Sequence, residues 1–179
     1  MKDYLKTALK LTSNITTTGA ISEFSRFVEK EITQYVNPEQ QQIIVEFGGG
    51  HGNMTKAILA RMHPDSQLFT FEIQEEFIPV LKEIQDKRLH IIHQSATEVL
   101  RYVQKSSADA IISTLPLNII PKDVQNEILT AAALCLKPLA TYSQALYLLR
   151  KDMMLQHFGE CRIEPTMNFP FAFVHHCNI

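Results

Sequence analysis

The chain of 179 residues lacks tryptophan and contains only six glycines and three cysteines. An odd number of cysteines without metal-ligand spacing predicts buried thiols in a reducing compartment rather than a disulfide framework. No apolar stretch reaches the length of a membrane-spanning helix, and the first residues resemble no secretory signal. Positive charge is also scarce, since the net charge is −2 and the pI is near 6.4, which disfavours a broad nucleic-acid-binding surface. These absences predict a cytoplasmic protein.

Internal repeats, low-complexity tracts and linkers are absent as well. A length of 179 residues with 45% apolar content is typical of one well-packed domain. We therefore expect a single domain spanning residues 1–179. An N-terminal helical segment at 1–38 would cover the site, and residues 39–179 would form the core.

Short β-branched runs alternate with helical segments from residue 43 onward, which predicts a mostly parallel sheet with helices on both faces. The last two runs are too close together for a helical crossover, so one strand near the C-terminus must be reversed. The fold class expected is a seven-stranded, Rossmann-like α/β sheet. The predicted strands are residues 43–47, 68–72, 89–93, 109–113, 141–149, 161–165 and 171–177.

Four of the six glycines lie within five positions of "IIVEFGGGHGNMTKAIL", directly after the first predicted strand. Gly48, Gly50 and Gly52 follow Glu46 with G-x-G-x-G spacing, which favours close approach of a ligand to the backbone. A glycine-rich turn without a ligand is the alternative. Glu72 ends the next strand, where a carboxylate can bind both hydroxyls of a ribose. Together the two features favour a nucleoside-containing ligand.

Three segments then carry a resemblance, namely "VEFGGGHG", "FTFEIQ" and "DAIISTLPL". In order and spacing they resemble the first, second and fourth motifs of class I S-adenosylmethionine-dependent methyltransferases. Within that superfamily the chain is most similar to bacterial phospholipid N-methyltransferases, at residues 17–32, 112–117 and 167–177. Thr114 stands where that family usually has glycine, and Phe171 where it has a second proline.

The resemblance implies S-adenosylmethionine as the cofactor, with S-adenosylhomocysteine as the product and no metal. The methionine part would lie over the glycines near Glu46, and Glu72 would bind the ribose. Ser95 and Ala96 stand where relatives often hold the adenine with a carboxylate. The implied cofactor-binding residues are Glu46, Gly48, Gly49, Gly50, Gly52, Glu72, Ile73, Ser95 and Ala96.

The resemblance also implies an acceptor edge beyond the fourth strand, formed by Ser113, Thr114, Leu115 and Pro116. Their carbonyls and hydroxyls would bind an acceptor amine, although a proline-terminated strand without substrate contact is the alternative. Tyr142, at the start of the fifth strand, would face the same crevice unless it is a packing residue. Methyl transfer by displacement depends mainly on alignment, so no catalytic triad or metal is expected.

Residues 1–12 predict a short amphipathic helix with a lysine stripe beside an apolar face. Two interpretations stay open, because such a helix can bind an anionic membrane or pack on the domain as a lid. The first would place the protein peripherally at the inner membrane face.

Three functions therefore remain. The leading hypothesis is a methyltransferase acting on the amine of a phosphatidylethanolamine-like aminolipid. The others are an RNA adenine N6-methyltransferase-like enzyme and a cofactor-binding protein without catalysis. Within the first, a soluble small molecule also stays open as the acceptor in place of the lipid. Nucleic acid is disfavoured because enzymes that extrude adenine stack it on an aromatic residue after this proline, whereas Leu117 follows Pro116 here. Oligomeric state is not predicted.

Overall fold

The computed structural model describes residues 24–179. The predicted amphipathic helix at residues 1–12 lies outside the described residues, as does part of the predicted segment 1–38. Within the described range, no helix combines the length and the apolar character needed to cross a membrane.

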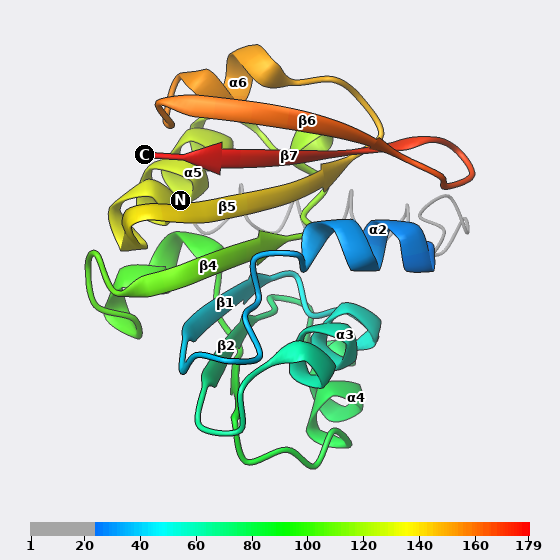
Figure 1. The fold of residues 1–179 in the computed structure, drawn as a ribbon, viewed down its shortest axis with the longest axis vertical. Coiled ribbons are helices and arrows are strands. Elements are labelled where there is room, and N and C mark those ends of the chain that lie inside the picture. Colours follow the sequence, from blue (N-terminus) through cyan, green and yellow to red (C-terminus); the bar gives the residue numbers. More distant parts are fainter. Residues whose placement is uncertain (1–23) are drawn as a thin grey trace.

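A single seven-stranded sheet organises the described chain (Figure 1). Its strand order is β3-β2-β1-β4-β5-β7-β6. The pairs from β3 through β5 are parallel, whereas β7 is antiparallel to both β5 and β6. The predicted α/β class with one reversed strand near the C-terminus is thus confirmed. The strands are β1 (Ile43–Phe47), β2 (Gln67–Phe71), β3 (Leu89–Ile92), β4 (Ala108–Ser113), β5 (Leu136–Leu146), β6 (Glu160–Thr166) and β7 (Ala172–Asn178).

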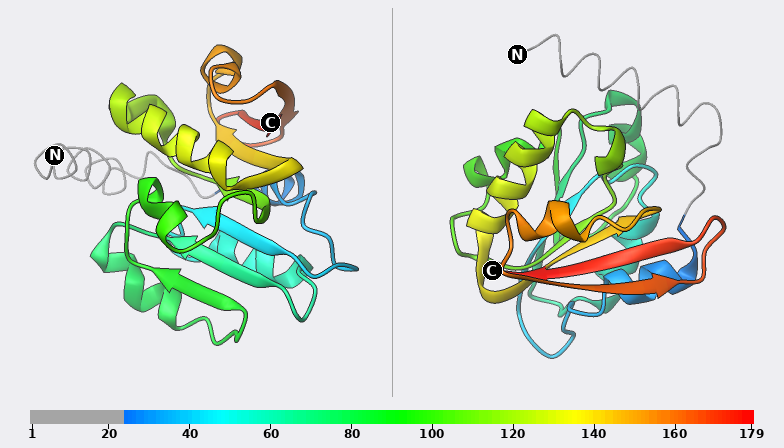
Figure 2. Two further views of the ribbon diagram at one scale, coloured as in Figure 1. Left: turned by 90° about the vertical axis from the view of Figure 1, so that its left-hand side faces the viewer. Right: turned by 90° about the horizontal axis from the view of Figure 1, so that it is seen from above.

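Helices cover both faces of the sheet (Figure 2). One buried cluster joins α2 and α3 to one face, and a second joins α5, α6 and the 3-10 turn η2 to the other. Successive side chains of β1 point to opposite faces of the sheet, so Ile44 belongs to the first cluster and Val45 to the second. The helices are α2 (Arg26–Ile32), α3 (Asn53–Arg61), α4 (Ile78–Lys82), α5 (Lys122–Cys135) and α6 (Lys151–Leu155), and the 3-10 turns are η1 (Glu75–Phe77), η2 (Ala96–Arg101) and η3 (Leu117–Ile119).

Two predicted elements differ from the structure. One of the helical segments predicted between the strands, the stretch between β2 and β3, is divided into η1 and the short α4, which has a proline in its first turn, and proline cannot continue a helix toward the N-terminus. Strand β5 begins directly after α5, earlier than predicted, and ends at Leu146 rather than at 149. Its ladder with β7 also ends there, at the pair Leu146 and Phe173.

The carboxyl ends of β1, β2 and β4 meet at one edge of the sheet because these strands are parallel. The glycine turn follows β1 at this edge. The reversed direction of β7 brings the turn between β6 and β7 to the same edge, beside the end of β5 (Figure 1). This edge is where an open α/β sheet binds its ligands.

Candidate cofactor and acceptor site

The glycine turn opens onto a cavity of about 280 Å³. Gly50 has a φ of 47°, and a Cβ built there meets no atom within 4 Å, so it would point into open space. Gly48 has a φ of 87°, and its Cβ would approach the Leu115 side chain at 3.2 Å. A Cβ at Gly49 would collide with Thr70 at 2.6 Å. The turn therefore places bare backbone on the cavity wall.

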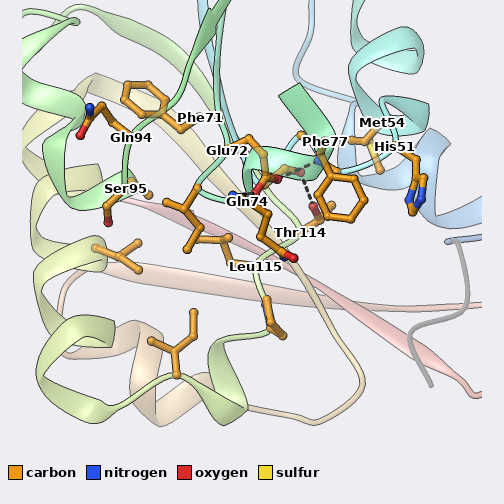
Figure 3. A pocket seen from close by; sticks show the side chains of 18 of the residues that line it. His51, Met54, Phe71, Glu72, Gln74, Phe77, Gln94, Ser95, Thr114 and Leu115 are labelled. Atoms are coloured by element: carbon orange, nitrogen blue, oxygen red, sulfur yellow. Dashed lines mark hydrogen bonds between the residues drawn. The ribbon is translucent and has the colours of Figure 1, made fainter. Parts of the chain in front are cut away.

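Among the labelled lining residues in Figure 3, Gln94 and Ser95 lie at one end and His51 and Phe77 at the other. Most of the predicted cofactor and acceptor residues lie on its wall. The predicted residues that line the cavity are Gly48, Gly49, Gly50, Glu72, Ile73, Ser95, Ala96, Thr114, Leu115 and Pro116.

Glu72 lies between these ends with its carboxylate held by backbone groups. Its Oε2 accepts a hydrogen bond from the Gly50 N–H at 2.9 Å, and its Oε1 accepts one from the Gln74 N–H at 2.8 Å. A carboxylate oxygen has two lone pairs, so each oxygen can accept one further hydrogen bond. Glu72 is thus oriented to receive two neighbouring hydroxyls, as a ribose presents them.

We expect Glu72→Gln to weaken binding of S-adenosylmethionine by about 1.5 to 3 kcal/mol, through loss of charge-assisted hydrogen bonds. The new amide nitrogen would also face a backbone N–H that it cannot pair with. Calorimetric titration measures the change. The exposed neighbour in η1 supplies the control, since Glu76→Gln should bind as the wild type does. Equal affinities for both variants would rule out the ribose role.

Glu46 departs from its predicted place on the cavity wall. It is fully buried, and its Oε2 accepts hydrogen bonds from the hydroxyls of Thr55 and Thr70, both at 2.7 Å. Its Oε1 has no hydrogen-bond partner among the described residues. Burial raises the pKa of Glu46 to about 7, against the two threonine hydrogen bonds that lower it, and the nearby Glu72 adds a smaller increase. Thr70 also lies against Gly49, so Glu46 supports the turn from within the core.

Gly52 also lies off the cavity wall. Its position begins helix α3, and a Cβ there would lie 2.8 Å from the Ile84 side chain. The φ of 80° and the close packing against Ile84, rather than ligand contact, therefore require this glycine. Helix α3 does reach the cavity through Asn53 and Met54. Its first-turn N–H groups and positive end are available to a carboxylate such as that of a methionine moiety.

The end of the cavity beside Ser95, where the sequence predicts the adenine, combines polar and apolar side chains. Ser95 Oγ accepts hydrogen bonds from the Thr97 N–H, at 3.3 Å, and from Thr97 Oγ1, at 2.9 Å, so its lone pairs are engaged while its proton can still be donated. Gln94 beside it offers an amide with both donor and acceptor atoms. Val124 and Ile128 of α5 supply apolar surface. These residues suit a flat ring with a hydrogen-bonding edge.

The acceptor loop after β4 is fixed by its own backbone. The Thr114 hydroxyl donates to the Gly48 carbonyl at 3.0 Å and so joins the loop to the glycine turn. The Leu115 carbonyl accepts from Gln144 Nε2 at 3.0 Å and from the Leu117 N–H at 2.8 Å. The Pro116 carbonyl accepts from the Ile119 N–H at 3.0 Å. The loop therefore presents a rigid edge to the cavity.

Two predicted acceptor residues are absent from that edge. Ser113 is fully buried and does not line the cavity. Tyr142 is also fully buried, and its ring stacks on Phe158 with centroids 5.0 Å apart. The prediction that Tyr142 faces the crevice is wrong, because its side of β5 packs into the core. Its hydroxyl instead donates to Gln144 Oε1 at 2.6 Å, which orients the amide that holds the Leu115 carbonyl.

Several lining residues were not predicted from the sequence. Phe24 and Glu29 reach the cavity only because α2 packs across the edge of the sheet, which no local spacing indicates. Asn53 and Met54, in contrast, directly follow the glycine turn, and that position could have indicated them. The lining residues that were not predicted are Phe24, Glu29, His51, Asn53, Met54, Phe71, Gln74, Phe77, Gln94, Ile120, Val124 and Ile128.

The adjacent histidines of β7 serve the structure. His176 is buried between Ser143 Oγ at 2.8 Å and Glu31 Oε1 at 3.1 Å, which ties α2 to the sheet. His175 Nε2 accepts the Arg150 N–H at 3.1 Å. Burial lowers the pKa of both rings, which favours their neutral forms. Across residues 24–179, no group of three or more His, Cys, Asp and Glu side chains is arranged to hold a metal ion.

Comparisons with known proteins place this site in context. A family model described as ribosomal RNA adenine dimethylase matches residues 22–136. An ornithine lipid N-methyltransferase of Singulisphaera acidiphila is 25% identical over 149 residues, covering 80% of this chain and 78% of that protein. A ribosomal RNA small subunit methyltransferase H of Polynucleobacter necessarius is 28% identical over 49% of this chain, which spans only 28% of that protein.

The fold has close counterparts among solved structures. A SAM-dependent methyltransferase from Aquifex aeolicus superposes with a TM-score of 0.68 at 11% identity, covering 92% of this chain and 96% of that one. Agreement over nearly the whole length of both chains supports the described sheet order. At this identity the likeness concerns the fold alone.

Proposed function

The chain belongs to the ribosomal RNA adenine dimethylase family and is an S-adenosylmethionine-dependent methyltransferase, and we propose that its methyl acceptor is the amine of a membrane aminolipid. The predicted class I methyltransferase and its cofactor are thereby confirmed. The identity of the methyl acceptor is the proposal, because family membership does not decide it.

The cavity fits two parts of this cofactor. Open space over Gly50 leaves room for the methionine chain, and Glu72 has lone pairs for the ribose hydroxyls. When bound, S-adenosylmethionine supplies a sulfonium methyl group, which a neutral amine takes through its lone pair as the carbon–sulfur bond breaks, releasing S-adenosylhomocysteine and then a proton. The chain's own task is to orient both partners and to exclude water.

One observation carries the choice of acceptor. The side chain that follows Pro116 is Leu117, and it is fully buried in the core instead of lining the cavity. An extruded adenine requires a stacking surface at its target site, because leaving the duplex or stem costs stacking energy. The loop offers no such surface at this position, whereas a primary amine on a flexible headgroup needs none.

The loop does offer a hydrogen-bond acceptor for an amine. The Leu115 and Pro116 carbonyls already accept hydrogen bonds within the described chain. Thr114 lines the cavity, and its carbonyl would accept an N–H from the incoming amine and so aim the amine's lone pair. Phe24 and Leu115 line the same cavity and supply apolar walls that favour the neutral amine over the ammonium.

A second candidate, RNA adenine methylation, rests on the name of the matched family. A lipid acceptor is supported by the ornithine lipid N-methyltransferase, which aligns over most of both chains and is named for a lipid amine. The net charge of −2 gives no general attraction to RNA phosphates. We further propose a peripheral location at the inner membrane face, and the amphipathic helix expected at residues 1–12 stays a prediction that would add to this contact.

An acceptor panel tests the proposal. Labelled S-adenosylmethionine is offered in parallel with phosphatidylethanolamine and ornithine-lipid vesicles, structured ribosomal RNA and soluble primary amines. We expect label in the lipid fraction, and a rate that rises with pH because only the neutral amine has a lone pair. Gly50→Val protein serves as the inactive control. Label in RNA or a soluble amine, with none in lipid, would exclude the lipid acceptor while leaving methyl transfer intact.

A further inference from the structure

Five large apolar side chains protrude into solvent on two neighbouring loops, and we call them the apolar tip. Met167, Phe169 and Phe171 lie in the turn between β6 and β7, and Leu148 and Leu149 follow β5. Their exposed fractions are 65%, 94%, 68%, 56% and 61% in that order. Single exposed apolar residues are common, but a group of this size on adjacent loops indicates an interaction surface.

The apolar tip lies at the edge of the sheet where the cavity opens. Pairing of Leu146 with Phe173 sets the end of β5 beside the start of β7. The turn is also fastened to the cavity wall, since the Ser25 hydroxyl donates to the Met167 carbonyl at 2.6 Å. The residue before Ser25 is Phe24, which lines the cavity and stacks on Tyr147 with ring centroids 5.6 Å apart. Whatever binds the tip is therefore held beside the wall of the cavity that Phe24 forms.

The charges around the tip suit an anionic lipid surface. Residues 166–173 carry no charge, whereas Arg150 and Lys151 follow Leu149 directly, ahead of the single acid Asp152. Arg150 donates to Asn118 Oδ1 at 3.0 Å, which holds its guanidinium near the acceptor loop. Cations beside a protruding apolar group can reach lipid phosphates while the apolar atoms enter the headgroup boundary.

The shape of the tip favours a bilayer over a rigid protein partner. The turn between β6 and β7 projects beyond the ends of β5 and α2 in Figure 1, and it is also the outermost part of that edge in the right-hand view of Figure 2. A stable protein interface usually buries about 1,200 to 2,000 Å² over complementary surfaces. A narrow projecting turn meets that requirement poorly, whereas a fluid headgroup layer adapts to it.

We propose that the apolar tip enters the membrane interface and seats the enzyme with its cavity facing the lipid headgroups. This deepens the proposed function and rests on it, because the aminolipid would then reach the acceptor loop without leaving the bilayer. The partner of the apolar tip is thus a membrane that contains anionic lipid.

The test replaces Phe171 and Leu149 with serine in the full chain and compares this double variant with Leu139→Ser. Leu139 is 86% exposed but lies near the start of β5, at the opposite edge of the sheet. Flotation uses vesicles of phosphatidylethanolamine and phosphatidylglycerol. We expect the double variant to bind at least about tenfold more weakly, since interfacial affinity scales with buried apolar area. The control should float as the wild type does.

Measurements of turnover distinguish a failure of the membrane-binding proposal from a failure of the proposed methyl acceptor. On a short-chain aminolipid below its critical micelle concentration the double variant should match the wild type, while on vesicles its turnover should fall with its binding. Unchanged vesicle binding by the double variant would overturn the proposal that the apolar tip binds the membrane. Sedimentation that shows the tip joining two copies of the chain would overturn it as well. If the wild type floats but methylates neither lipid form, the acceptor assignment fails while the surface stands.

Discussion

Gly50→Val is expected to reduce affinity for S-adenosylmethionine by at least about a hundredfold, or about 3 kcal/mol. The wild-type position faces open space with no atom within 4 Å of a built Cβ, so the valine branches would occupy the volume needed by the methionine chain. The φ of 47° also strains a β-branched residue, at a cost on the order of 1 to 3 kcal/mol, which a folded domain can tolerate. Calorimetric titration of folded protein measures the loss.

The strain needs its own control, and the chain supplies one. Leu139 has a φ of 66° far from the cavity, so Leu139→Val places a β-branched side chain in the same backbone region without touching the site. We expect its cofactor affinity to equal that of the wild type. Normal binding by a folded Gly50→Val protein would mean that the cofactor does not lie over the glycine turn.

The second large effect concerns stability and comes from Glu46. Its pKa of about 7 lies above the ordinary value of 4.5, so the folded state holds this proton more tightly than the unfolded state does. The resulting stabilisation is complete below pH 4.5 and is lost as pH rises through 7. The shift corresponds to about 3 kcal/mol in the free energy of unfolding. Burial is its main cause, because the carboxylate form must give up water inside the core.

Glu46→Gln should remove this pH dependence, because an amide resembles the protonated acid and has no proton to lose. Urea unfolding at pH 4.5 and pH 8 then gives the comparison. From pH 4.5 to pH 8, the free energy of unfolding of the variant should rise by about 3 kcal/mol relative to that of the wild type. Glu39→Gln, an exposed change in the loop before β1, should show no such gain. If the free energies of unfolding of Glu46→Gln and of the wild type change in parallel with pH, the pKa of Glu46 is not raised and the side chain is ionised in the native protein at neutral pH.

The sheet and half of the site could be predicted because their signals are local. Alternating runs of β-branched residues mark strands, and the crowding of glycines marks a turn that needs positive φ, as Gly48 and Gly50 confirm. Glu72 was recognisable because a carboxylate at the end of a buried strand has few structural reasons to be there. These features depend on residues close together in the sequence.

The rest depends on contacts between distant residues. Phe24 and Glu29 reach the cavity through packing of α2 against β5 and β7, which no periodicity reveals. Tyr142 and Gln144 occupy the same side of β5, so their hydrogen bond was geometrically available, but sequence cannot show whether that side faces the crevice or the core. Glu46 has the residue type and spacing of a ligand contact, and only its burial beneath the turn reveals a supporting role.

Mass-resolved lipid extracts from cells that express this chain test the central claim most directly, with Gly50→Val as the matched inactive chain. Aminolipids heavier by one or more methylene units should accumulate with the wild type and be absent with the variant. A lipid profile identical for both chains, together with methylated adenosine in digested ribosomal RNA from the wild type alone, would contradict the account.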